Sequence, residues 1–170
     1  MEQKEEVNMD EIKLLELLEQ NARMEYKDLA DILEVSVDEV ASKVKELENK
    51  HVIRGYHTVI NWDKNNHEVV KAIIEVNATP ERDSGYDHIA KYIYNYDEVS
   101  SMYLISGTVD FLVFIEGKTM KEVANFVAMK LAPIEGVTGT KTQFVLKGYK
   151  VDGVKMEDED KSQERRLVIP

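Results

Sequence analysis

The sequence has no cysteine among its 170 residues. Disulfide bonds, thiolate metal sites and cysteine nucleophiles are therefore excluded. Long apolar segments are missing too: the longest strongly apolar run is Phe111–Ile115, whereas a membrane-spanning helix needs about 20 apolar residues. The charged residues 1–6 lack the apolar stretch of a secretory signal. We therefore expect a cytoplasmic protein that has no membrane partner.

Basic residues are scarce relative to acidic ones. Lys and Arg number 22 against 33 Asp and Glu, which gives a formal net charge of -11. This balance opposes a gross attraction to nucleic acid. It leaves room for a small basic site, because exposed charges act within a Debye length of about 8 to 10 Å. The apolar content of 43% is typical of a globular protein with one large or two small domains.

The first sixty residues contain three helical patterns and one β-rich segment. Apolar residues recur at helical spacing in three segments, at about residues 10–21, 26–34 and 37–49. Ser36 and Glu39 have the spacing of a capping box, which fixes the start of the third helix. The segment 52–60 is rich in β formers. This order predicts a winged helix-turn-helix over residues 1–61.

The second half begins after a polar, turn-rich linker at residues 62–68. The predicted order is strand 69–78, helix 86–93, strands 99–106 and 109–116, helix 120–131 and strand 137–151. This βαββαβ order predicts a ferredoxin-like domain over residues 69–151, with both helices on one face of an antiparallel sheet. The fold class is therefore α+β, and we expect a homodimer to cover the other face. Residues 152–170 are expected to form a charged, mobile tail.

Several short motifs together resemble a known family. They are Asp10…Ile12…Leu14-Leu15…Leu18…Asn21-Ala22-Arg23, Asp28-Leu29-Ala30, Lys45-Glu46-Leu47-Glu48 leading into Val52-Ile53-Arg54-Gly55-Tyr56, Ser106-Gly107-Thr108-Val109-Asp110 and Gly139-Thr140-Lys141-Thr142. In this order the chain resembles, over about residues 9–150, the Lrp/AsnC (leucine-responsive/asparagine regulator) family of prokaryotic transcription factors. The resemblance implies a half that binds double-stranded DNA and a half that dimerises and often binds a free amino acid. Octamers or other multiples of dimers are common in that family.

One side of the third helix is a candidate DNA-binding surface. Ser42, Lys45 and Asn49 recur on the side that the apolar stripe leaves outward, and their side chains offer donors and acceptors for base edges. The other candidates are Lys27, Ser36, Lys43, Lys50, Arg54 and His57, of which the basic ones suit phosphate contacts. The alternative is that this side of the helix is only a solvated face.

The charge of residues 1–61 motivates a second hypothesis. This segment holds 8 basic and 15 acidic residues, a net charge of -7, and is the most acidic part of the chain. Non-specific affinity for DNA comes mainly from phosphate contacts, which an acidic domain is poorly equipped to make. An amino-acid-sensing assembly partner with weak or no DNA binding is therefore the alternative to a DNA-binding regulator.

The loop between the two central predicted strands is the candidate ligand site. A glycine there allows a tight turn and exposes backbone groups, and an aspartate at a strand start attracts an ammonium group. The resemblance implies that an amino acid binds at this loop between dimers, near two threonines of the last strand. The candidate residues are Gly107, Thr108, Val109, Asp110, Thr140 and Thr142. The alternative is that Gly107 and Asp110 only build a β-turn.

Catalytic and metal sites are not predicted. The four histidines, at positions 51, 57, 67 and 88, show no metal-ligand spacing. The sequence has no phosphate-binding glycine loop, no His-Glu-x-x-His and no serine elbow. Siroheme decarboxylases resemble the same two-part architecture, but we find no convergent set of histidine and arginine for a tetrapyrrole. We expect a protein that is not an enzyme and has no cofactor beyond an amino-acid effector.

Overall fold

The computed structural model describes residues 9–65 and 69–157. His67 and residues 158–170, which make up most of the predicted tail, lie outside the described residues. The chain divides into two compact units, residues 1–58 and 59–170, and each is described by itself. In the described ranges, no helix is long and apolar enough to cross a membrane.

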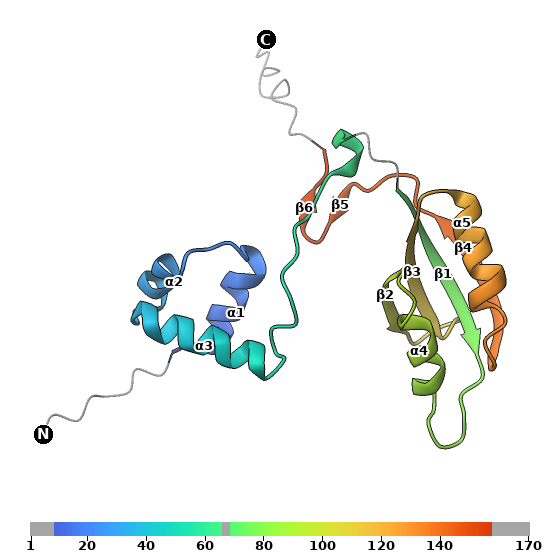
Figure 1. Cartoon of the computed structure of the whole chain (residues 1–170), viewed down its shortest axis with the longest axis horizontal. Coiled ribbons are helices and arrows are strands. Elements are labelled where there is room, and N and C mark those ends of the chain that lie inside the picture. The colour runs from blue at the N-terminus through green and yellow to red at the C-terminus, as the bar shows by residue number, and fades with distance from the viewer. Residues whose placement is uncertain (1–8, 66–68, 158–170) are drawn as a thin grey trace, which may run out of the picture. The chain divides into compact units, whose positions relative to one another are not determined.

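The N-terminal unit consists of three helices, as the apolar spacing predicted (Figure 1). They are α1 (Glu11–Gln20), α2 (Tyr26–Leu33) and α3 (Val37–Asn49). Their shared core contains the buried side chains of Leu14, Leu18, Leu29, Ala30, Val40, Val44 and Leu47. The predicted capping box is confirmed, because Ser36 and Glu39 each bond the backbone amide of the other. The start of α3 is therefore fixed by a local interaction as well as by packing.

The predicted β segment at 52–60 is wrong. After α3 the backbone makes a turn, in which the amides of Val52 and Ile53 both donate to the carbonyl of Leu47, and it then continues without strand structure to Ile60. The segment has β-forming residues but no partner strand in the described part of the chain, and a strand requires a hydrogen-bonded ladder. Residue propensity alone therefore does not make a wing strand here.

The C-terminal unit is built on one antiparallel sheet, whose strands and helices are visible in Figure 1. Its elements are β1 (Val70–Ala78), α4 (Asp87–Tyr94), β2 (Val99–Leu104), β3 (Phe111–Gly117), α5 (Met120–Phe126) with a π-helical continuation (Val127–Leu131), and β4 (Val137–Phe144). The strand order is β2-β3-β1-β4, with every neighbouring pair antiparallel. The predicted ferredoxin-like arrangement is confirmed. Residues Trp62–Asn65 of the predicted linker form a short 3-10 helix.

The core of this unit lies on one face of the sheet. Alternate residues of β1 and β3 are buried there against both helices, as the period of two in a strand requires. The buried members are Ala72, Ile74, Val76, Ala78, Phe111, Val113 and Ile115 of the strands with Ile89, Ile93, Val123, Phe126 and Leu131 of the helical segments. On the opposite face Ile73 pairs with Phe114, and Tyr103 with Leu112. Tyr103 is 57% exposed, so this face has an uncovered apolar patch, beside which the ion pairs Lys71–Glu116 and Glu75–Lys141 also lie.

The last predicted strand is shorter than expected. It ends at Phe144, and Lys150–Val151 (β5) instead pair with Val154–Lys155 (β6) in a hairpin. Asp152 and Gly153 form its turn with φ of 44° and 80°, the two positive angles that a type I′ turn needs. The expected tail therefore does not begin at residue 152. The amide of the Asn61 side chain donates a 2.7 Å bond to the carbonyl of Met156 and attaches this end to the start of the unit.

Candidate functional site

The solvent-facing side of α3 carries the three predicted base-reading residues. Ser42, Lys45 and Asn49 are all exposed. Val40, Val44 and Leu47, on the other side of the helix, are at most 1% exposed. Lys45 has no ion-pair partner among the residues that the structure describes. One face of α3 is therefore anchored in the core, while the other presents a continuous row of donors and acceptors.

Lys43 occupies a different environment from Lys45. Its ammonium lies 2.7 Å from the carboxylate of Glu11 on α1 and 3.5 Å from that of Glu46. The hydrogen bond with Glu11 raises the pKa of Lys43, against a smaller opposing effect of desolvation. Lys43 thus joins α3 to α1. The structure does not place it with the outward row.

Ser36, predicted as part of the same surface, is bonded within the capping box. Its hydroxyl donates to the Glu39 carboxylate at 2.6 Å and accepts from the Glu39 amide at 3.2 Å. Ser36 therefore positions the first turn of α3. The other basic candidates, Lys27, Lys50, Arg54 and His57, are exposed. Lys50 is ion-paired with Glu46, and Lys27 and Arg54 have no ion-pair partner within the described ranges.

A contact between the end of α3 and the following segment was not foreseen from the sequence. The hydroxyl of Tyr56 donates a 2.9 Å bond to the carboxylate of Glu48. Partial burial and this bond raise the pKa of Tyr56 to about 12, so the phenol stays protonated. The contact holds the segment that contains Arg54 and His57 beside α3. No spacing rule connects two such residues, one of which lies outside the helix.

The loop of the candidate ligand site is attached to β1 through Asp110. The amide of Asp110 donates to the carbonyl of Val76 at 3.1 Å, and its carboxylate accepts from the amide of Ala78 at 2.8 Å. The hydroxyl of Tyr86 donates to the other carboxylate oxygen at 2.6 Å. The bond from Tyr86, and then that from Ala78, lower the pKa of Asp110. This geometry favours the interpretation that Asp110 organises the turn.

Gly107 leaves space at the tip of the loop. It does not adopt a positive φ, and a Cβ built on it would meet no atom within 4 Å. We expected this glycine to allow a tight turn, but its φ is one that other residues also adopt. The exposed backbone at Gly107 and Thr108 remains accessible to a ligand.

The two threonines lie on β4, on the far side of β1 from the loop. Thr140 pairs with Val76, the same residue whose carbonyl bonds Asp110, while Thr142 pairs with Ile74. The structure therefore brings Thr140 to the level of Asp110 and places Thr142 two residue pairs further along β1. Neither of the two hollows described below is lined by these threonines or by residues 107–110. Within one chain, the loop residues Gly107 and Thr108 of the candidate ligand site are exposed, while Asp110 and the two threonines are half-buried.

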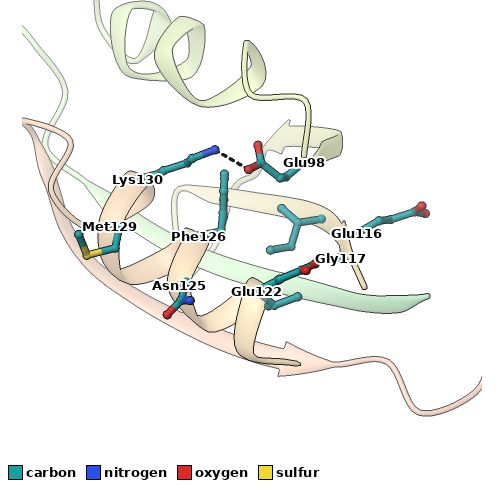
Figure 2. A pocket seen from close by; sticks show the side chains of 10 residues that line it. Glu98, Glu116, Gly117, Glu122, Asn125, Phe126, Met129 and Lys130 are labelled. Carbon is teal, nitrogen blue, oxygen red and sulfur yellow. Dashed lines mark hydrogen bonds and ion pairs between the residues drawn. The ribbon is translucent and has the colours of Figure 1, made fainter. Parts of the chain in front are cut away.

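Two hollows are present elsewhere in this unit. One, of about 390 Å³, lies between α4 and β2 and is lined by Tyr94, Met102 and Leu104 among others. The other, of about 450 Å³, lies between α5 and the end of β3 and is shown in Figure 2. Sequence reasoning missed both, because each is formed by residues from separate elements. No group of three potential metal ligands occurs in the described ranges.

Comparison with known proteins matches each half of the chain to a known domain family. Residues 9–54 match the winged helix-turn-helix DNA-binding family, and residues 71–154 match the Lrp/AsnC ligand binding domain. The chain is 40% identical over 160 residues to the uncharacterized HTH-type transcriptional regulator YugG of Bacillus subtilis, with 94% of this chain and 95% of that protein covered. The chain belongs to the Lrp/AsnC family of transcriptional regulators. The resemblance seen in the sequence motifs is thereby confirmed.

Other relatives and solved structures are consistent with this assignment. The regulator Ptr1 of Methanocaldococcus jannaschii is 31% identical over 146 residues, covering 86% of this chain and 95% of Ptr1. The structure of Escherichia coli AsnC matches with a TM-score of 0.63 at 20% identity, covering 83% of this chain and 93% of that one, and supports the α+β fold. The L-methionine complex of the regulator NMB0573 from Neisseria meningitidis matches with a TM-score of 0.65 at 26% identity, covering 83% and 90%.

Proposed function

We propose that this transcriptional regulator reads its operator with the outward row of α3, and that a free amino acid at residues 107–110 alters its assembly or operator affinity. The exposed row of Ser42, Lys45 and Asn49, opposite a fully buried face, is the observation that supports the DNA-reading part. A helix anchored in this way enters a major groove with its polar side toward the base edges.

Phosphate contacts would come from the exposed basic residues around this row. Lys27 and Arg54 are exposed and have no ion-pair partner in the described ranges, whereas Lys50 would have to leave Glu46. Because the N-terminal segment is acidic overall, few cations would contribute to affinity. Each phosphate contact adds about 0.9 to the slope of log affinity against log salt, so we expect a shallow salt dependence.

A homodimer, and multiples of it such as an octamer, is proposed as the assembled form. The uncovered sheet face presents an apolar patch of Ile73, Leu112, Phe114 and the exposed Tyr103, and such a patch favours association. Two-fold pairing would present two α3 helices to successive half-sites, and the operator would then be an imperfect palindrome.

The proposed effector is a free amino acid. The space beside Gly107, the exposed backbone of the loop and the hydroxyl of Thr140 offer groups that bond an ammonium or a carboxylate. The relative NMB0573 was solved with L-methionine. Because the loop site is open within one chain, a second dimer would complete it. A coupling of about 1 to 3 kcal/mol between ligand and operator is typical of such switches.

The proposed role is regulatory and not enzymatic, since the relatives above are named as transcriptional regulators. A DNA-binding protein of a prokaryotic family acts where the chromosome is, so we propose a cytoplasmic location. One observation favours the alternative of an assembly partner with weak DNA binding: Lys43, a predicted phosphate contact, is held by Glu11.

Fluorescence anisotropy with the protein's own promoter region tests the DNA-reading part. Lys45→Ala should weaken binding to the preferred fragment about tenfold or more, the usual worth of a base contact. Lys13→Ala removes the same charge from α1 and serves as the matched control. Equal affinity of the two variants, or no preference of the wild-type protein for its promoter, would support the alternative.

A further inference from the structure

The three lysines of α3 differ in their ionic partners. Lys43 pairs with Glu46, three residues later, and with Glu11, while Lys50 pairs with the same Glu46 from four residues later. Residues three or four positions apart on a helix are surface neighbours, so pairs of this kind form readily. Lys45 has no ion-pair partner in the described part of the chain and is thus the exception among these lysines.

Glu48 is the helical neighbour that could pair with Lys45. Among the residues three or four positions from Lys45, only Glu48 is acidic. A lysine followed three residues later by a glutamate is also the arrangement of Lys43 and Glu46, whose charged groups lie 3.5 Å apart. Helical spacing therefore favours a Lys45–Glu48 pair, yet no ion pair joins these two residues in the structure.

The carboxylate of Glu48 is instead bonded by Tyr56. The Tyr56 hydroxyl donates a 2.9 Å hydrogen bond to Oε1 of Glu48. Partial burial, and then this bond, raise the pKa of Tyr56 to about 12, so the phenol is a donor at every pH where operator binding is measured. A hydrogen bond to an ionised carboxylate is worth more than an exposed ion pair. Glu48 is therefore held toward the segment that follows α3.

The turn after α3 fixes the position of Tyr56. The amides of Val52 and Ile53 donate to the carbonyl of Leu47 at 2.9 and 3.3 Å, and the Ile53 side chain packs against the core of the N-terminal unit. Tyr56 comes three residues after this anchor, and its bond with Glu48 is a second one. The segment is thus held at two points although it forms no strand.

We propose that Tyr56 is a positioning residue for operator binding: by holding Glu48, it keeps the ammonium group of Lys45 available for a base edge. The inference rests on the function proposed above, in which Lys45 contacts the operator. Without the hydroxyl, the Glu48 carboxylate would turn toward Lys45 and compete with DNA for its ammonium. Tyr56 acts through these two side chains and itself makes no contact with DNA.

Removal of the hydroxyl tests this role by fluorescence anisotropy with the promoter fragment. Tyr56→Phe should weaken operator binding about two- to fivefold, the usual worth of one exposed ion pair. Tyr92→Phe removes the hydroxyl of an exposed tyrosine on α4 and should bind like the wild type. Thermal unfolding of both variants checks that the N-terminal unit is folded at the temperature of the titration.

A variant of Glu48 separates this role from a merely structural one. Glu48→Gln removes the charge that would compete for Lys45, so adding Tyr56→Phe to it should change operator affinity by less than about 1.5-fold. Tyr56→Phe should likewise have no effect once Lys45→Ala is present, because the ammonium is then gone. If Tyr56 only supported the fold, its loss would weaken binding equally with and without Glu48→Gln.

The outcomes separate this inference from the function on which it rests. If Lys45→Ala weakens binding but Tyr56→Phe does not, or if Tyr56→Phe weakens it equally with and without Glu48→Gln, the role of Tyr56 is refuted while the DNA-reading function stands. If Lys45→Ala binds the promoter as the wild type does, both are refuted.

Discussion

The hydroxyl of Tyr86 donates a 2.6 Å hydrogen bond to the carboxylate of Asp110. This bond joins the residue before α4 to the end of the β2–β3 loop, so two segments that are distant in sequence hold each other. Asp110 also accepts the amide of Ala78 at the end of β1. The end of the loop at the proposed effector site is therefore held in place by the two hydrogen bonds that the Asp110 carboxylate accepts.

Removal of this hydroxyl should destabilise the C-terminal unit in a pH-dependent way. The bonds from Tyr86 and Ala78 lower the pKa of Asp110. A lowered carboxyl pKa contributes stability above its ordinary value, and this contribution is lost as the pH falls through the lowered one. Tyr86→Phe should therefore lower the melting temperature by a few degrees at neutral pH and by much less at about pH 3. Tyr94→Phe, on an exposed tyrosine of α4, is the control. If Tyr86→Phe lowered the melting temperature equally at both pH values, the ionised Asp110 would not be the partner of the Tyr86 hydroxyl.

The capping box at the start of α3 predicts a loss of stability without loss of a core contact. Ser36→Ala removes the side chain that accepts the Glu39 amide, and such a change costs about 1 kcal/mol of unfolding free energy. Ser42→Ala, on the exposed side of the same helix, should leave stability within about 0.5 kcal/mol. Urea unfolding followed by circular dichroism measures both. A smaller effect for Ser36 than for Ser42 would count against the capping role.

Two lysines of α3, two residues apart, should behave in opposite ways. Lys43→Ala removes the ion pair with Glu11 and should lower the melting temperature of the N-terminal unit, with only an indirect effect on DNA affinity. Lys45→Ala should leave the melting temperature unchanged and weaken operator binding about tenfold or more. Thermal unfolding and anisotropy on the same preparations separate the two effects. The reverse pattern would show that Lys43 is the DNA contact.

Two glycines provide a matched test of backbone requirements. Gly136 has φ of 88°, and a Cβ there would lie 2.7 Å from Ile89, whereas Gly107 has an ordinary φ and open space. Gly136→Ala should cost about 2 to 5 kcal/mol from backbone strain and overpacking together. Gly107→Ala should leave stability nearly unchanged and weaken amino-acid binding. A thermal-shift screen of the twenty amino acids against wild type and Gly107→Ala checks the second part, and an unchanged response would remove Gly107 from the proposed site.

The parts of the fold that the sequence predicted are those decided by local periodicity. The bounds of α3 follow from its apolar stripe and from the capping box of Ser36 and Glu39, both of which lie within a few residues. The βαββαβ order follows from alternating and helical apolar patterns in the same way. The strand predicted at residues 52–60 is absent, because a strand needs a hydrogen-bonded partner and residue propensity does not provide one. The hairpin at Asp152-Gly153 has a local turn signal, because Asp-Gly is a typical type I′ pair.

The candidate site was harder to predict because its decisive contacts are not local. Lys43 and Lys45 are the same residue type on one helix, but Lys43 is half-buried and pairs with Glu11, 32 residues earlier, as well as with Glu46. Asp110 is bonded by residues 24 and 32 positions away. The hollow beside α5 is lined by residues of β3, of α5 and of its π-helical continuation, which no sequence pattern brings together. Placement of such residues requires the tertiary structure.

Strand β1 has hydrogen-bonded neighbours along both of its edges. At Val76 the carbonyl holds Asp110, and on the other edge the same residue is paired with Thr140. The β2–β3 loop, β1 and β4 are therefore connected through Val76. A shift of one of them that keeps these hydrogen bonds also shifts the other two. An effector at the loop tip would consequently act on the sheet as a rigid unit. A small rotation of the sheet at the loop would then displace the edge strand β4 by a larger distance.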